Sequence, residues 1–126
     1  MVAKAEAKFI RISPFRARMV MALIKGFNAQ KAVAVLASLD QKAAFLLAKV
    51  LKSAMANAKQ KGYDPDKLYI SRMAANPGPM LKRFRAATFG RATGILKRLS
   101  HLVVEVDTTE KIVSASKAAV KSAKGK

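Results

Sequence analysis

Apolar and polar residues alternate with a regular period over much of this chain, and the first periodic segments predict a strand followed by a helix. Residues Lys8 to Ile12 (KFIRI) alternate with a period of two, which predicts a short β-strand. Ser13 and Pro14 then predict the start of a helix that runs to Lys25, because Ser caps free N–H groups and Pro suits the first helical position. We expect its apolar stripe to consist of Met19, Val20, Leu23 and Ile24.

The clearest helical pattern runs from Gln41 to about Lys61, and a shorter helix precedes it, with Asn28 as its expected N-cap and its end at about Ala37. Asp40 is the expected N-cap of the longer helix. At about 100° per residue, one side of that helix is apolar and consists of Ala43, Ala44, Leu47, Val50, Leu51, Ala54, Met55 and Ala58. The opposite side carries Lys42, Lys49, Lys52 and Lys59.

Two further strands are predicted, at Lys67 to Asn76 and at Leu99 to Asp107. The segment between them begins with Pro77 and Pro79, which cannot sit in a central strand because proline has no N–H to donate. If residues 77–100 form a hairpin that turns near Phe89 and Gly90, each half of about a dozen residues spans roughly 40 Å. A globule of this length has a radius of gyration of about 14 Å, so the hairpin should protrude from the body. We call residues 77–100 the arm.

The composition fits one small domain. The chain has 126 residues and a mass of 13.6 kDa, with 52% hydrophobic but only 6% aromatic residues and no Trp, so we expect an aliphatic core. We assign residues 1–107 to a single domain. Residues 108–126 form an Ala/Lys/Ser-rich tail, for which we expect either disorder or a helix induced by a partner.

The net charge narrows the class of partner. Lys and Arg number 25 against seven acidic residues, which gives a formal charge of +18 and a pI near 10.8, so a polyanion such as nucleic acid is the first candidate. We find no apolar run long enough to cross a membrane and no signal-peptide pattern, so we expect a cytosol-like compartment. The absence of Cys excludes disulfides, thiol catalysis and the usual structural zinc sites.

The arm carries the strongest binding signal, since it has six cations and no acidic residue occurs from Lys67 through Val104. A two-stranded ribbon without a core is marginal in water, which favours an arm held by phosphates. The expected RNA-binding residues are Lys8, Arg11, Arg16, Arg18, Lys49, Lys52, Lys59, Lys82, Arg83, Arg85, Arg91, Lys97, Arg98 and His101. The helical lysines among them have an equally good alternative as solvated surface. Asn57 could contact RNA or a backbone group.

Catalytic chemistry has little support. His101 is the only histidine, so an acid/base pair or metal site would lack a second His and any Cys, and the acidic residues stand mostly at caps, turns and ends. We expect no enzyme, no metal and no cofactor. His101 should instead be a strand residue that faces RNA or the sheet edge.

The sequence also resembles a known family, the bacterial large ribosomal subunit protein twenty-two, found at the peptide exit tunnel. The resemblance covers about Ala7 to Asp107 and rests on several segments in the same order. They are RISP at residues 11–14, AKVLKSAMANA at 48–58, DPDKLYI at 64–70, GPMLKRF at 78–84, GRA at 90–92 and KRLSHLVVEV at 97–106.

The resemblance implies an α+β body of order β-α-α-α-β-β, with helices packed on a three-stranded antiparallel sheet. It further implies that the hairpin reaches through large-subunit ribosomal RNA and that its tip lines the exit tunnel. The implied partners are this RNA, neighbouring ribosomal proteins and the nascent peptide, on cytoplasmic ribosomes, with an organellar origin left open. No membrane or small-molecule substrate is implied, although changes near Leu81, Lys82 and Arg83 alter macrolide response in the family. The implied tip residues are Arg85, Ala86, Ala87, Thr88, Phe89, Gly90 and Arg91.

This chain departs from the family pattern at two places. Residues 86–89 are Ala-Ala-Thr-Phe where relatives commonly have a proline and extra arginines, so Phe89 could stack on a base instead. Phe15 stands where a basic residue is common. Two other functional classes remain as alternatives: a histone-like protein that compacts DNA with basic β-arms, and a cation-rich binder of membrane surfaces.

Overall fold

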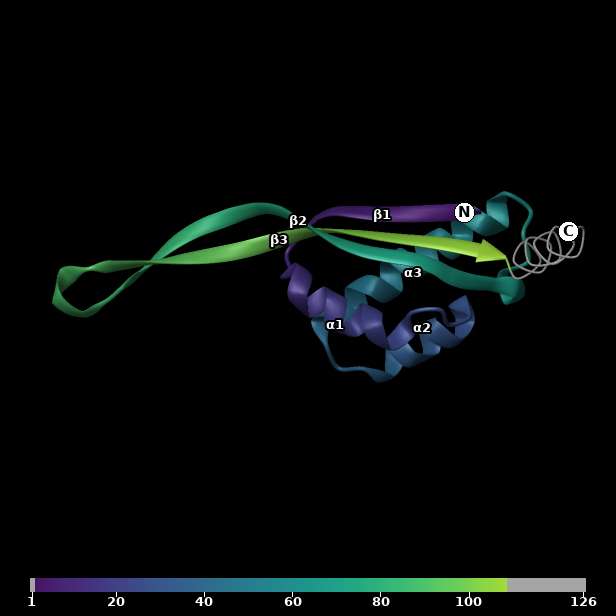
Figure 1. Ribbon diagram of the computed structural model, residues 1–126, viewed down its shortest axis with the longest axis horizontal. Helices are drawn as coiled ribbons and strands as arrows, with labels where there is room; N and C mark the ends of the chain where they lie inside the picture. Colours follow the sequence, from purple (N-terminus) through teal and green to yellow (C-terminus); the bar gives the residue numbers. More distant parts are fainter. Residues whose placement is uncertain (1, 109–126) are drawn as a thin grey trace, which may run out of the picture.

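The computed structural model describes residues 2–108, which form an α+β fold with one antiparallel sheet of three strands, as predicted. The strands are β1 (Ala3–Ile10), β2 (Leu68–Ala86) and β3 (Ala92–Thr108), in the order β1-β3-β2. The helices are α1 (Pro14–Ile24), α2 (Ala29–Ser38) and α3 (Lys42–Gln60), with 3-10 turns η1 at Pro65–Lys67 and η2 at Thr88–Gly90. Figure 1 shows the helices on one side of the sheet and a long ribbon of β2 and β3 that leaves the body.

The first strand begins earlier than its sequence pattern predicts. We expected Lys8 to Ile12, whereas β1 starts at Ala3 and ends at Ile10. Ala3 pairs with Val106 and Ala5 with Val104 on the buried face of the sheet. Alanine has a low strand propensity, so this part of β1 is recruited by the strongly apolar β3 rather than by its own sequence.

Helix α3 provides the centre of the core, because it packs across β1 and β3 while α1 packs against β2 (Figure 1). The predicted apolar face is confirmed: Ala44, Leu47, Leu51, Ala54 and Ala58 have at most 1% of their surface exposed. Met55 is only partly buried.

Helix α1 is rotated relative to our expectation. Val20 and Ile24 are buried as predicted, but Met19 and Leu23 are 56% and 53% exposed. The core face is completed instead by Ala17 and Met21. The helix is apolar on two sides, so its sequence does not specify which side packs. The small Ala17 allows close approach to the body, and Arg18 fixes the rotation by donating to the Ala75 carbonyl at 2.8 Å.

The three predicted helix caps have different outcomes. Ser13 stands at the N-cap position of α1, but its side chain makes no cap hydrogen bond. The side chain of Asn28 accepts a hydrogen bond from the Gln30 N–H at 3.0 Å, which confirms it as the N-cap of α2. The prediction for Asp40 is wrong, because Gln41 is the N-cap of α3 and makes no side-chain cap bond. The helix starts one residue later than an Asp40 cap requires, so that carboxylate cannot reach the first free N–H groups.

The arm is a continuation of the sheet, with β2 and β3 paired from Leu68↔Thr108 to Ala86↔Ala92. Pro77 and Pro79 are tolerated because β2 is an edge strand, and the register shifts between Pro77 and Met80. The chain reverses at η2 (Thr88–Gly90), close to the predicted turn. The hairpin prediction is therefore confirmed.

The described part of the chain ends within the sheet, since Thr108 is the last residue of β3 and is buried. Our expectations for residues 109–126 lie outside the described residues. Within residues 2–108, no helix has the length and apolar character needed to cross a membrane.

Candidate nucleic-acid interface

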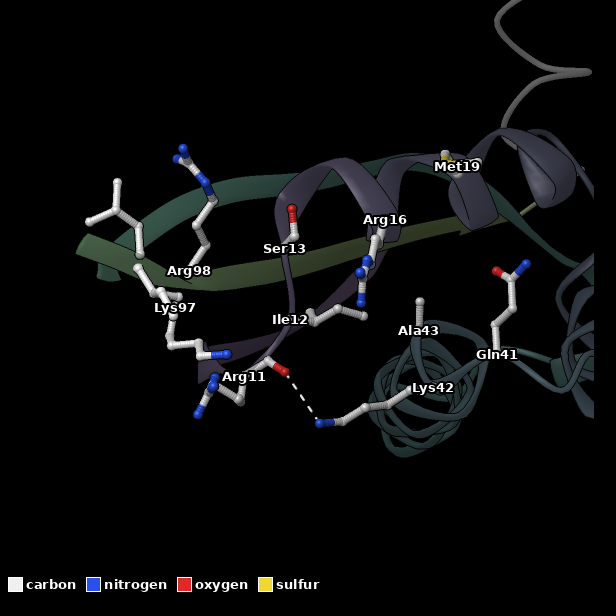
Figure 2. Close-up of a pocket in the computed structure, with 12 residues that line it drawn as sticks. Arg11, Ile12, Ser13, Arg16, Met19, Gln41, Lys42, Ala43, Lys97 and Arg98 are labelled. Atoms are coloured by element: carbon white, nitrogen blue, oxygen red, sulfur yellow. Dashed lines mark hydrogen bonds between the residues drawn. The ribbon is translucent and has the colours of Figure 1, made fainter. Parts of the chain in front are cut away.

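An open cleft of about 1010 Å³ lies where the arm joins the helical body. Figure 2 shows its lining side chains, which come from the segment before α1, from the starts of α1 and α3, and from β3. Five of the lining residues are cationic. Within the described chain, the cleft has no acidic lining residue. We call this site the cationic cleft; it is lined by Arg11, Ile12, Ser13, Arg16, Met19, Gln41, Lys42, Ala43, Ile95, Leu96, Lys97 and Arg98.

Tertiary packing brings these cations together. Buried Ile12 anchors the link between β1 and α1, which places Arg11 before it and Arg16 after it at the cleft. Lys42, the first residue of α3, donates through Nζ to the Arg11 carbonyl at 3.3 Å (Figure 2). Lys97 and Arg98 enter from β3 just beyond the body. The result is a polar concave surface with an uncompensated positive charge, which suits a polyanion.

The arm presents its cations in a regular register. Across the two strands, no cation stands directly opposite another: the pairs are Met80↔Arg98, Leu81↔Lys97, Lys82↔Leu96, Arg83↔Ile95, Phe84↔Gly94 and Arg85↔Thr93. Like charges directly opposite each other would destabilise a two-stranded ribbon. This pairing therefore avoids that loss of stability in a highly charged arm.

The cations of the arm also divide between its two faces. Because successive strand residues point to opposite faces and paired residues to the same face, Arg83, Arg85 and Lys97 share one face. Lys82 and Arg98 lie on the other. All five side chains are exposed. The arm can therefore bind phosphates on both sides at once.

The tip of the arm is a tight turn held by a hydrogen bond from the Ala87 N–H to the Arg91 carbonyl at 2.8 Å. Phe89 has a φ of 59° and Gly90 a φ of 67°, a left-handed pair that closes the turn. The Phe89 ring is 100% exposed. The tip thus consists of one aromatic side chain at its apex, between Arg85 and Arg91 at its base.

Several predicted RNA-binding residues lie apart from the cleft. Lys49, Lys52 and Lys59 are exposed on α3, and Lys8 is exposed beside the irregularity in β1. Lys49 Nζ stands 4.6 Å from the centre of the Phe45 ring. These four lysines are accessible but do not share a concave site with the arm.

Among the polar side chains considered for RNA binding, Arg18, Asn57 and His101 bond to distant parts of the protein, and Arg83 donates to the carbonyl of the adjacent Lys82 at 2.8 Å. The guanidinium of Arg18 is bonded to Ala75, as described above. Asn57 Nδ2 donates to the Lys4 carbonyl at 3.0 Å, which favours the backbone alternative for this residue. His101 Nδ1 accepts a hydrogen bond from the Phe9 N–H at 3.1 Å, so one ring nitrogen of His101 is not available to RNA.

Sequence reasoning missed part of the cleft. Lys42 was placed on the lysine face of its helix but not among the binding residues, and Ser13 and Gln41 were considered only as positions near helix starts. One signal was present, because Lys42 and Arg11 both adjoin helix starts. Their proximity depends on how α1 packs on α3, which no local pattern specifies.

In the described part of the chain, the acidic and histidine side chains do not gather into a metal site. Within residues 2–108, no group of three or more His, Cys, Asp or Glu residues could hold a metal ion. The Lys and Arg side chains that line the cationic cleft are suited to the binding of anions.

Comparison with known proteins assigns the family. The family model for "Ribosomal protein L22p/L17e" matches residues 5–107. The large ribosomal subunit protein uL22 of Sulfurihydrogenibium sp. (strain YO3AOP1) is 47% identical over 102 residues, 81% of this chain and 88% of the relative. The uL22 protein of Clostridioides difficile (strain 630) is 47% identical over 107 residues, which are 84% of this chain and 96% of the relative. The uL22 protein of Desulfotalea psychrophila is 44% identical over 108 residues, which are 85% of this chain and 98% of the relative. With its arm, its cationic cleft and these similarities over most of its length, the chain belongs to the ribosomal protein L22p/L17e family.

Proposed function

We propose that this protein is a structural constituent of the large ribosomal subunit, where it binds and stabilises the subunit's RNA. The observation that carries this proposal is the cationic cleft at the root of an arm that has exposed cations on both faces. The names of the relatives, all large ribosomal subunit proteins, support the same assignment. Neighbouring ribosomal proteins are the other expected partners, and no catalytic step is needed for this role.

The division of charge between the faces of the arm indicates how the RNA is bound. A ribbon that lay on an RNA surface would need cations on one face only, whereas this arm offers Arg83 and Arg85 on one face and Lys82 and Arg98 on the other. The arm therefore fits between RNA segments rather than on top of them. Arg is suited to this because its planar guanidinium binds a phosphate with two parallel hydrogen bonds.

We further propose that the tip lines the exit tunnel and meets the nascent peptide. Residues Ala86 to Gly90 are uncharged and exposed, so this segment is not suited to binding phosphate. It is suited to a wall past which a peptide moves without strong binding. The neighbourhood of Leu81, Lys82 and Arg83, which we relate to macrolide response, lies between this tip and the body.

Sedimentation of cell extract containing the tagged protein tests the proposal. We expect the protein to co-migrate with the large subunit at moderate and at high salt, because an arm between RNA segments is held by shape as well as by charge. A histone-like protein would migrate with the nucleoid and would be released by high salt. Migration with the nucleoid, or loss from the subunit at high salt, would contradict the proposal.

A further inference from the structure

Helix α1 has an apolar outer side that nothing in the described structure covers. Phe15, Met19 and Leu23 follow one another at a spacing of four residues, so they share one face of the helix. They are 70%, 56% and 53% exposed. Ala22 on the same face is also exposed, and no charged residue stands between them on that face. We call Phe15, Met19, Ala22 and Leu23 the α1 ridge.

The α1 ridge begins at the cationic cleft. Met19 belongs to both, since it lines the cleft as well as the ridge. Phe15 lies between Ser13 and Arg16, two residues that line the cleft, and one turn before Met19. Phe15 itself does not line the cleft, so an RNA strand held there would bring a base to this exposed ring from the adjoining surface of α1.

We propose that the cleft and the start of the α1 ridge bind unpaired RNA, with phosphates in the cleft and one base stacked on Phe15. This inference rests on the proposed RNA-binding function and specifies which form of RNA this site takes. An unpaired nucleotide can turn its base away from the backbone onto an aromatic side chain, and RNA-binding proteins commonly use this arrangement. A base inside a duplex has both faces covered by its neighbours and cannot stack on protein.

The charge around the ridge favours RNA over a protein partner. Arg11, Arg16 and Lys42 stand at its cleft end, and no acidic residue lines that end within the described chain. A protein docked on the ridge would have to neutralise these cations with its own acidic residues. The phosphates of a single RNA strand do this next to every base, so one ligand satisfies the cations and the ring together.

The absence of Trp from the chain permits a direct test. A Phe15→Trp variant keeps an aromatic platform and carries the only indole in the protein. We expect a short oligouridylate to quench its fluorescence, since a base stacks on the ring, and an RNA duplex of equal length to leave it unquenched. Phe45→Trp is the matched control, because Phe45 is 61% exposed on α3 but Lys49 Nζ already stands 4.6 Å from the centre of its ring, where a base would have to stack. We expect no quenching there.

Affinity measurements separate stacking from general apolar contact. Phe15→Leu keeps an apolar side chain without a ring, so we expect affinity for oligouridylate to fall roughly tenfold while affinity for the duplex stays the same. Leu23→Ala, further along the ridge, should alter neither. Circular dichroism should be unchanged for all of these exposed positions.

The outcomes distinguish this inference from the proposed function. If the parent protein binds both RNAs with a salt-dependent affinity but the fluorescence of the Phe15→Trp variant does not respond to oligouridylate, stacking on Phe15 is wrong and RNA binding stands. A blue shift without quenching in purified large subunits that carry this variant would show that a protein covers the ridge, which also overturns the inference. If the parent binds neither RNA, the proposed function fails with it.

Discussion

The N–H of Phe9 donates a hydrogen bond to Nδ1 of His101 at 3.1 Å, across a separation of 92 residues. The two rings also meet edge to face, with centroids 5.0 Å apart and planes at 87°. Phe9 has a φ of 59° and lies where the register of β1 with β3 shifts, between Ala7 and Ile10. His101 therefore takes up a backbone N–H that the irregular strand does not direct to a ladder partner.

Gly78 lies against the other side of the same histidine. A Cβ at Gly78 would stand 3.3 Å from two atoms of the His101 ring and 3.3 Å from the Leu99 carbonyl oxygen. Phe9, His101 and Gly78 thus form a joint at the root of the arm. This position gives His101 a role in positioning the arm, and its predicted contact with RNA stays a prediction.

We predict that His101→Ala loosens this joint without unfolding the body. The Phe9 N–H is at an exposed residue, so water replaces its partner and the stability loss should be about 1 kcal/mol. Amide hydrogen exchange should speed up at Phe9 and at the first residues of the arm. Unchanged exchange at Phe9 would mean that the hydrogen bond does not hold this segment.

Gly78→Ala should also destabilise, because its new methyl group presses on the histidine ring. Removing the ring first should relieve much of that cost, so we expect the double variant Gly78→Ala/His101→Ala to lose less stability than the sum of the two single variants. Denaturant melts of all four proteins measure this coupling. Additive losses of stability would indicate that a methyl group at Gly78 is disfavoured by the Leu99 carbonyl oxygen and not by the His101 ring.

Arg16 and Arg18 provide a matched pair for testing the cleft. Arg16 lines the cleft, whereas Arg18 is bonded to the Ala75 carbonyl. We expect Arg16→Gln to reduce the slope of log K against log salt for RNA binding by about 0.7 to 0.9, the value for one phosphate contact. Arg18→Gln should lower the melting temperature and leave the slope unchanged. Equal slopes for Arg16→Gln and the parent would remove Arg16 from the interface.

Core truncation should affect folding before binding. Leu47 has 0% of its surface exposed on the sheet side of α3, so Leu47→Ala should cost about 2 to 5 kcal/mol of unfolding free energy. Phe45→Ala, two residues away on the exposed side, should cost well under half as much. Thermal melts compare the two variants directly, and a reversed order would place the core on the wrong side of α3.

Removal of residues 82–97, the outer part of the arm, should leave a folded body. All buried apolar residues of the described structure lie outside residues 82–97, so replacing this segment by a short turn removes no core side chain. We expect a native circular dichroism spectrum and continued entry into the large subunit, with an altered macrolide response. An unfolded product would show that the arm contributes to the core, and a folded product that fails to enter the subunit would show that the arm is needed for assembly.

The sequence predicted elements whose periodic pattern has one apolar face. Helix α3 is the best example, since Leu47, Leu51 and Ala58 recur on one side and all are buried. For the arm, the prolines only excluded a central strand at its base, and the hairpin itself was implied by the family resemblance. The information that decides the structure of α3 is therefore local, whereas the local sequence alone left the arm as a conditional prediction.

The features that the sequence did not predict depend on packing between distant segments. Met19 and Leu23 are exposed because of the rotation of α1 about its axis. The small Ala17 and the hydrogen bond from Arg18 to the Ala75 carbonyl determine this rotation. The early start of β1 follows from pairing with Val104 and Val106. Lys42 joins Arg11 in the cleft only because α1 and α3 begin close together. Charge content identified the class of ligand, but the place where the cations converge required the structure.

The position of β3 between β1 and β2 also constrains when this protein can fold during its own synthesis. Ala3 pairs with Val106, so the first strand has no ladder partner until nearly the whole described chain has been translated. The arm needs only contacts between neighbouring segments, such as Ala86 with Ala92, so it can close as soon as its own residues have been translated. Loop closure over about a hundred residues is slow compared with a hairpin turn. A nascent chain should therefore carry a formed arm before its body closes, with a basic ribbon already available to RNA.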